Sequence, residues 1–176
     1  MITSGLVGLR ARQEADVAIL HGELYDDVVT ATRGDTRAWR PVDLSSGSPY
    51  AVERPTDKEA SFSVVELATG DLAGAAIVWE IDAHNRSAHL GLTLRPAFRG
   101  RGLGSETLRA LCVYGFDFLG LHRLQIETIT DNHAMIAAAE KAGFTREGIL
   151  RDDAWVLGEF VSDVIYGLLD SEYRQR

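Results

Sequence analysis

The sequence predicts a mixed α/β fold: a mostly antiparallel sheet of about seven strands, with helices on both of its faces. Two features of the chain carry this prediction. Three alternating apolar segments between residues 61 and 94 are separated by short turns, which is typical of antiparallel strands. A helical pattern then connects the third of these strands to another at 123–130, and a strand–helix–strand unit of this kind pairs its strands in parallel.

The first third of the chain predicts one strand, one helix and an irregular segment. Residues 6–10 have the pattern of a short strand, and residues 13–25 repeat apolar side chains at helical spacing. Asp26 and Asp27 end that helix, either as a plain pair of charges or as a site for a cationic substrate. Residues 32–56 are rich in glycine, proline and serine and leave room for one short helix. A loop of this length in a compact domain often covers a site.

The remaining elements follow in alternation, and we find no internal repeat or linker, so residues 1–176 are expected to form a single domain. The complete order is β-α-(α)-β-β-β-α-β-α-β-β. Strands are expected at 61–67, 72–81, 88–94, 123–130, 144–149 and 155–169, with one helix ending near Gly120 and another between Asn132 and Gly143.

Composition excludes several classes of function. A net charge of −8 argues against general nucleic-acid binding, and no apolar run is long enough to span a membrane. Cys112 is the only cysteine, so no disulfide can form within the chain. It lies on the apolar face of the predicted helix, so we expect a buried thiol. The histidines show no metal-ligand spacing, and no signal peptide is visible, so we expect no metal and a cytoplasmic protein.

The most informative stretch is Arg99-Gly100-Arg101-Gly102-Leu103-Gly104, which joins a predicted strand to a predicted helix. A glycine-rich loop at a helix N-terminus offers unpaired backbone N–H groups and the positive end of the helix dipole. These features suit a phosphate. Taken alone, the loop could equally be an ordinary turn.

Three segments together resemble the GNAT superfamily of acyl-CoA-dependent N-acyltransferases. Arg99, Gly102 and Gly104 match its pyrophosphate loop, Arg/Gln-x-x-Gly-x-Gly/Ala. Asn132, with the later Glu-Lys-Ala-Gly-Phe at 140–144, is similar to the family's Asn-containing helix. The segment Glu-Gly-Ile-Leu-Arg at 147–151, with Asp163 and Tyr166 downstream, resembles the RimJ/RimL-like subgroup, which acetylates protein N-termini or small-molecule amines. The resemblance covers the chain from about residue 60 onward.

The resemblance implies that the chain binds acetyl-CoA. Backbone groups of Leu92 and Leu94 would hold the pantetheine arm as an added strand would, and Asn132 would bond it from the opposite side. The pyrophosphate would lie over the backbone of the loop. The implied cofactor-binding residues are Leu92, Leu94, Arg99, Gly100, Arg101, Gly102, Leu103, Gly104, Ser105 and Asn132.

The implied reaction is direct attack of an amine on the thioester carbonyl in a ternary complex. The backbone N–H of Leu92 would serve as an oxyanion donor. Where the subgroup usually has Glu, this chain has His89, and an imidazole can take a proton near neutral pH. His89 is therefore a candidate base, or else a strand histidine without a role. Glu80 is an alternative base, or a solvated charge at a strand end.

The general acid is missing from the positions where relatives have one. The Tyr, Ser and Glu of family members fall here on Ala139, Met135 and Ala154. Water or Tyr114 could replace them, and because a thiolate is a fair leaving group, no dedicated acid is obligatory.

Two functions therefore stand side by side. The first is an N-acetyltransferase acting on a protein N-terminus or a small-molecule amine, as a monomer or homodimer. The second is a catalytically weak acyl-CoA-binding sensor or interaction domain. The loop and Asn132 support cofactor binding in both, so catalysis is what separates them.

Overall fold

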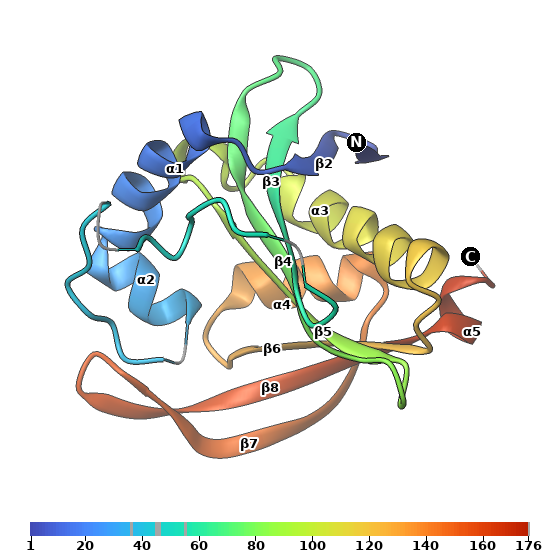
Figure 1. Ribbon diagram of the computed structural model, residues 1–176. Helices are drawn as coiled ribbons and strands as arrows, with labels where there is room; N and C mark the ends of the chain where they lie inside the picture. Colours follow the sequence, from blue (N-terminus) through green and yellow to red (C-terminus); the bar gives the residue numbers. More distant parts are fainter. Residues whose placement is uncertain (36, 45–46, 55, 176) are drawn as a thin grey trace.

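The computed structural model describes residues 1–35, 37–44, 47–54 and 56–175 (Figure 1). An eight-stranded sheet with the order β1-β2-β3-β4-β5-β6-β8-β7 organises them. All neighbouring strands are antiparallel except β5 and β6. The strands are β1 (Ile2–Ser4), β2 (Val7–Ala11), β3 (Ala60–Glu66), β4 (Leu72–Asp82), β5 (Ser87–Leu94), β6 (Arg123–Ile129), β7 (Thr145–Val156) and β8 (Glu159–Leu169).

Helices connect these strands, and none among the described residues is both long and apolar enough to cross a membrane. Two α-helices continue directly into π-helical turns: α1 into η1 and α3 into η3. The helical elements are α1 (Glu14–Leu20), η1 (His21–Tyr25), α2 (Val28–Gly34), η2 (Pro96–Phe98), α3 (Leu103–Cys112), η3 (Val113–Phe118), α4 (His133–Ala142) and α5 (Asp170–Tyr173).

The single parallel pair divides the sheet into two arms. Strands β5 and β6 are paired only where Ser87–His89 lie beside Arg123–Gln125. Beyond that point β5 continues beside β4 alone, and β6 continues beside β8 alone. Figure 1 shows the two arms diverging toward α2. We call the unpaired region between residues 90–94 and 126–129 the strand opening.

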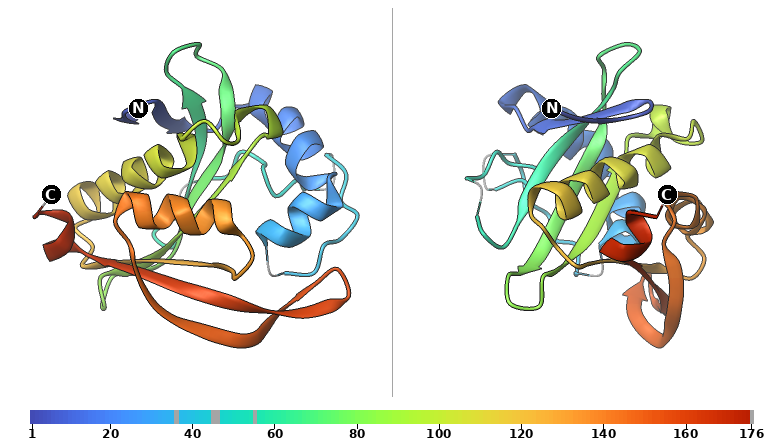
Figure 2. Two further views of the ribbon diagram at one scale, coloured as in Figure 1. Left: turned by 180° about the vertical axis from the view of Figure 1, so that it is seen from behind. Right: turned by 90° about the vertical axis from the view of Figure 1, so that its right-hand side faces the viewer.

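Each face of the sheet carries its own helices. In the left panel of Figure 2, α3 and α4 lie over one face, and the segment after α2 lies behind the sheet. The main core lies between the first face and these helices, with Leu90, Leu108 and Ile126 among its fully buried members. A smaller cluster joins Leu20 and Leu24 to β4 on the opposite face. Side chains on this second face of the sheet therefore point toward the helices and loop of the N-terminal third.

The predicted fold class is confirmed, and the structure adds one strand and moves one boundary. The sheet has eight strands rather than about seven, because Ile2–Ser4 adds an edge strand. The strand expected to end at residue 149 continues to Val156, and β8 begins at Glu159. A bulge between Leu150 and Ala154, with Asp152 at φ +53°, lets β7 pass through a polar segment that looked like a loop.

The predicted helices are confirmed, and one optional helix is present. Residues 14–25 form α1 and η1, and Gly143, at φ +98°, ends α4. The described residues have one short helix in this region, α2, but it overlaps only the start of the segment 32–56 where a helix was allowed. It begins earlier than expected, because Asp27 caps it by accepting from the backbone N–H of Thr30 at 3.3 Å. The C-terminal turn α5 was not predicted.

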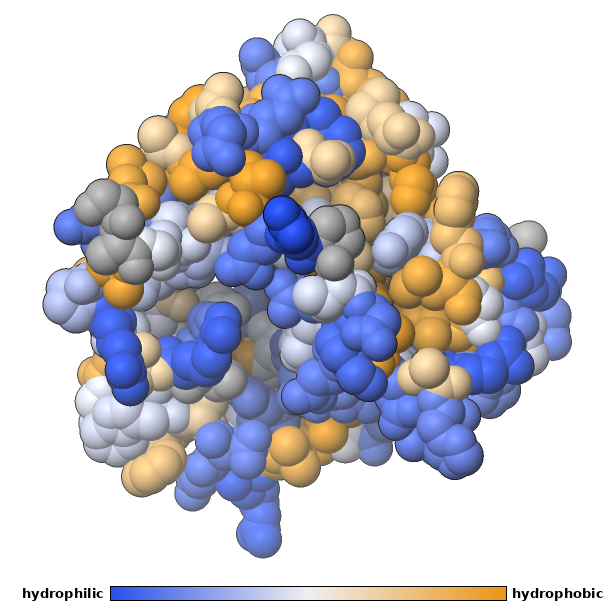
Figure 3. Space-filling model, in the orientation of Figure 1, coloured by the Kyte–Doolittle hydropathy of each residue, from blue (hydrophilic) through white to orange (hydrophobic). Residues whose placement is uncertain are grey.

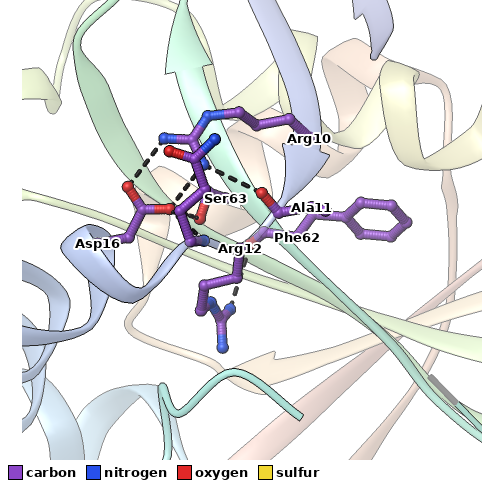
Figure 4. A network of polar contacts seen from close by, with 7 residues as sticks. Arg10, Ala11, Arg12, Asp16, Phe62 and Ser63 are labelled. Carbon is purple, nitrogen blue, oxygen red and sulfur yellow. Dashed lines mark hydrogen bonds and ion pairs between the residues drawn. The ribbon is translucent and has the colours of Figure 1, made fainter. Parts of the chain in front are cut away.

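A buried carboxylate holds α1 against the sheet (Figure 4). Both oxygens of Asp16 accept from Arg10 on β2, at 2.6 and 2.8 Å, and Ser63 on β3 donates at 2.7 Å. The backbone N–H of Gln13 donates at 2.9 Å. Burial opposes ionisation of Asp16, but these donors outweigh it and lower its pKa from 3.8 to about 2. The network thus fixes the helix from which α2 extends.

We expect Asp16→Asn to lower the free energy of unfolding at pH 7 by about 2 kcal/mol, the value of the pKa difference. Because the folded-state pKa is depressed, this stabilisation is present above pH 4 and is lost as the pH falls toward 2. Urea unfolding at pH 7 and pH 3 measures it, and the difference from wild type should shrink at pH 3. Asp35→Asn, which breaks an exposed ion pair with Arg37, is the control and should cost less than about 1 kcal/mol.

Candidate functional site

The glycine loop forms an open N-terminus for α3, at the tip of the arm that contains β5. Gly100 and Gly102 have φ values of +72° and +81°, which side chains rarely adopt, and Gly102 is the N-cap. Gly102 has no side chain that could cap the helix, and none of the described side chains caps it. A Cβ added at Gly100 or Gly102 would meet no atom of the described part of the chain within 4 Å, so these residues leave the space around the loop open. Backbone N–H groups of Leu103, Gly104 and Ser105 thus face an accessible helix end, the geometry of an anion site.

Gly104 has a different role from the other two glycines of the loop. It lies within α3, and a Cβ added there would meet the Cβ of Ala138 on α4 at 3.6 Å, an ordinary contact. A methyl group therefore fits at this position, whereas a larger side chain would project toward α4. The hydroxyl of Ser105 donates to the carbonyl of Gly102 at 3.0 Å, which secures the turn.

The two arginines of the loop are both engaged by the protein. Arg99 donates from Nε to the carbonyl oxygen of Leu94 at 2.9 Å and lies 3.5 Å from Thr30 on α2. Arg101 pairs with the buried carboxylate of Glu66 at 2.5 Å. The charge of Arg101 is therefore neutralised locally, and Arg99 lies between the end of β5 and α2.

The backbone of β5 presents alternate residues to the strand opening. The N–H of Arg95 donates to Ala73 of β4 at 2.9 Å. Because backbone groups of successive strand residues point to opposite sides, the N–H and C=O groups of Leu92 and Leu94 face away from β4. They therefore face the unpaired side, where an extended chain could add as a strand does.

The other arm places Asn132 at the start of α4, across the strand opening. Its side-chain oxygen accepts from the N–H of Met135 at 3.2 Å, and its amide nitrogen donates to Thr128 at 3.0 Å. The side chain is therefore already used as a helix cap. Its predicted contact with the pantetheine arm stays a prediction.

The structure brings together His89 and Glu80, the two candidate bases. The Nε2 of His89 lies 3.5 Å from a carboxylate oxygen of Glu80, and its ring lies 5.4 Å from that of Trp79. Glu80 has a φ of +50° in a bulge of β4 and is mostly exposed. His89 is half-buried on the second face, where the pairing of β5 with β6 ends.

Glu127 on β6 completes this group, and the sequence reading missed it. An oxygen of Glu127 lies 3.9 Å from Nδ1 of His89 and accepts from Gln125 at 2.6 Å. The alternation of polar and apolar residues in β6 places Gln125 and Glu127 on one face of the strand. That Glu127 lies near His89 follows from the parallel register of β5 and β6, which the sequence does not show.

None of the three positions where relatives have an acid offers one here. Ala139 is fully buried, and Met135 packs against the main core. Ala154 lies between the two strands predicted at 144–149 and 155–169, but it is a buried residue of β7. Tyr114 packs its ring edge-on against Phe62 of β3, at 5.0 Å, two strands away from β5. That contact leaves the acid role of Tyr114 without structural support.

Helix α2 contacts both arms at the strand opening. Arg33 donates to Asp131, just after β6, at 2.8 Å, while Thr30 lies beside Arg99 of the loop. Asp27 caps this helix, and Asp26 lies 3.3 Å from the ring of His21. Both carboxylates are thus engaged within the N-terminal third, which favours their structural interpretation over the cationic-substrate interpretation.

Other hollows lie elsewhere on the molecule. One, of about 620 Å³, lies beside Cys112 and Tyr173, and another, of about 610 Å³, lies between His21 and Trp39. Figure 3 shows that the face carrying the N-terminal third is recessed and that its rim is mainly hydrophilic. Within the described ranges, no group of three or more His, Cys, Asp or Glu side chains could hold a metal ion.

Comparisons with known proteins agree with this architecture. A provisionally named ribosomal N-acetyltransferase, YdaF, of Bacillus subtilis (strain 168) is 34% identical over 61% of this chain and 58% of its own. The spermidine N(1)-acetyltransferase of Vibrio cholerae is 27% identical over 64% of this chain and 65% of its own. The chain thus spans about three fifths of the length of the curated relatives it matches.

A solved structure shows the same fold over nearly the whole chain. The spermidine N-acetyltransferase from Vibrio cholerae, in complex with CoA and spermine, aligns with a TM-score of 0.78 and 19% identity, covering 96% of this chain and 98% of its own. The family profile described as "Acetyltransferase (GNAT) domain" matches residues 7–145. The chain therefore belongs to the GNAT acetyltransferase family.

Proposed function

We propose that the protein transfers an acetyl group from acetyl-CoA to a primary amine, by direct attack of the amine in a ternary complex. The observation that carries this proposal is the placement of the uncapped N-terminus of α3 beside the strand opening, with His89 where the opening begins. Family membership supports the chemistry, since relatives are named as N-acetyltransferases. The finer assignment to the RimJ/RimL-like subgroup stays a prediction.

The residues present fit acetyl-CoA. The diphosphate would lie over the N–H groups of 100–105, where the glycines leave open space and no side chain competes for the helix end. The pantetheine arm would enter the strand opening beside Leu92 and Leu94, and Asn132 would approach it from α4. Bound in this way, acetyl-CoA supplies the activated acyl group.

The chain's own groups would promote the attack in two ways. His89, half-buried between Glu80 and Glu127, would accept the proton that the attacking nitrogen loses, directly or through a water. The backbone N–H of Leu92, which faces the strand opening, would donate to the oxygen that becomes negative during the attack. Met135, Ala139 and Ala154 cannot donate a proton, so the departing thiolate would take its proton from water.

The acceptor class is open between a small-molecule amine and a protein N-terminus. The similar proteins act, by their names, on spermidine or on the ribosome. The alternative function is an acyl-CoA-binding sensor or interaction domain. It is motivated by Met135, Ala139 and Ala154, which replace the acids of relatives with side chains that cannot donate a proton.

Thiol release from acetyl-CoA over a panel of amines separates these two functions. The panel should include linear monoamines, diamines and short peptides with free N-termini. We expect amine-dependent release together with formation of the acetylated amine. Tight acetyl-CoA binding without turnover of any amine would favour the sensor, and absence of acetyl-CoA binding would exclude both.

A further inference from the structure

One carboxylate on the second face of the sheet is buried with an unpaired oxygen. Asp163 of β8 is 2% exposed, and no residue that the structure describes makes a hydrogen bond to its buried Oδ1. It lies opposite Ile129 on β6 and Leu150 on β7. An unpaired carboxylate oxygen in the protein interior is costly, so a polar or charged occupant at this position would stabilise it.

The charged groups that act on Asp163 have its own sign. Burial raises the pKa of Asp163, and the carboxylates of Asp153 and Glu127 raise it further. Glu127 lies opposite Ile165, two residues beyond Asp163 on the same strand, so Glu127 and Asp163 are diagonal neighbours on one face. A positive charge at this position would relieve the mutual repulsion of these three carboxylates.

These carboxylates extend across the sheet from the candidate base. Nδ1 of His89 on β5 lies 3.9 Å from Glu127 on β6. The next strands in the sheet, β8 and β7, carry Asp163 and Asp153. We call Glu127, Asp163 and Asp153 the carboxylate row. Adjacent strands are about 4.8 Å apart, so the row begins beside His89 and reaches about 10 Å or more from β5. Glu127 and Asp153 are exposed, and Asp163 is the buried floor between them.

We propose that the carboxylate row binds a second protonated nitrogen of the acceptor, so that the preferred acceptors are linear diamines or polyamines. One nitrogen would lie beside His89 and react, while another, separated from it by a short methylene chain, would pair with Asp163. A monoamine or a single N-terminal amine would leave the row unfilled. This inference rests on the proposed function, because the row selects the amine that the same site would acetylate.

Calorimetric titration of the protein, saturated with CoA, compares 1,4-diaminobutane with 1-aminobutane. We expect the wild type to bind the diamine at least about 10-fold more tightly, the value of a charge-assisted hydrogen bond. Asp163→Asn keeps the shape of the side chain and removes its charge, and it should abolish most of that preference while leaving the monoamine unaffected. Asp71→Asn, in the exposed turn before β4, removes one charge elsewhere and should change neither affinity.

The outcome does not depend on turnover. Loss of the diamine preference in Asp163→Asn supports the carboxylate row even if no amine is acetylated, in which case only the proposed function fails. Equal binding of both amines by wild type, or an unchanged preference in a folded Asp163→Asn protein, overturns the row even if acetyl transfer is found. Should Asp163→Asn fail to fold by circular dichroism, Asp153→Asn, at an exposed position, makes the same comparison.

Discussion

Gly104→Glu is expected to weaken binding of acetyl-CoA by more than about 100-fold. The added side chain would project toward Ala138, where a Cβ alone already makes an ordinary contact at 3.6 Å, and would fill the space between α3 and α4. Its carboxylate would also place a negative charge beside the backbone donors proposed for the diphosphate, and each lost hydrogen bond to a charged group costs about 1.5–3 kcal/mol. Calorimetry with acetyl-CoA measures the loss.

Gly104→Ala is the matched control for this substitution. Gly104 does not have a positive φ, and the added methyl group makes a contact of normal length, so the variant should fold and bind nearly as the wild type does. The thermal unfolding midpoint of each variant without ligand establishes whether α3 still forms. Normal acetyl-CoA binding by a folded Gly104→Glu protein would refute the placement of the diphosphate on this loop.

His89→Ala is expected to lower kcat by about 100-fold or more while leaving acetyl-CoA binding intact. A positioned base contributes about 10²–10⁴ to a rate, and the lower end applies where water can partly replace it. The imidazole lies on the second face of β5, whereas the proposed cofactor contacts on the same strand are made by backbone groups, so substitution should not disturb them. Initial rates at saturating acetyl-CoA and amine measure the change.

The exposed turn between β4 and β5 offers a matched control in His84. His84→Ala removes an imidazole of the same size from a solvent-exposed position and should leave kcat unchanged. An unchanged kcat in His89→Ala at saturating substrates would remove His89 from the mechanism and leave Glu80 and Glu127 as candidates.

Local chemistry explains which features the sequence could predict. The glycine loop could be predicted because Gly100 and Gly102 have positive φ values, which few other residues adopt. The end of the helix at Gly143 could be predicted for the same reason. Strands β3, β4 and β5 could be predicted because short turns separate three segments of alternating apolar residues. These signals lie within a few residues of the features they specify.

The missed features depend on contacts between distant parts of the chain. Asp152 and Asp153 look like a loop, yet pairing with β8 carries them through a bulge. Arg101 reads as a phosphate ligand until Glu66, 35 residues away, is seen to bind it. The carboxylate row combines β6, β7 and β8, and its assembly requires strand order and register. No local pattern specifies either quantity.

A crystal structure of the complex with CoA tests the central claim most directly. We expect a diphosphate bonded by backbone N–H groups of residues 100–105 and a pantetheine arm lying between β5 and β6 beside Leu92 and Leu94. We further expect the thiol sulfur to lie on the side of the strand opening where His89 is found. A diphosphate bound elsewhere, such as the hollow beside Cys112, or a sulfur separated from His89 by the body of the sheet, would contradict the account.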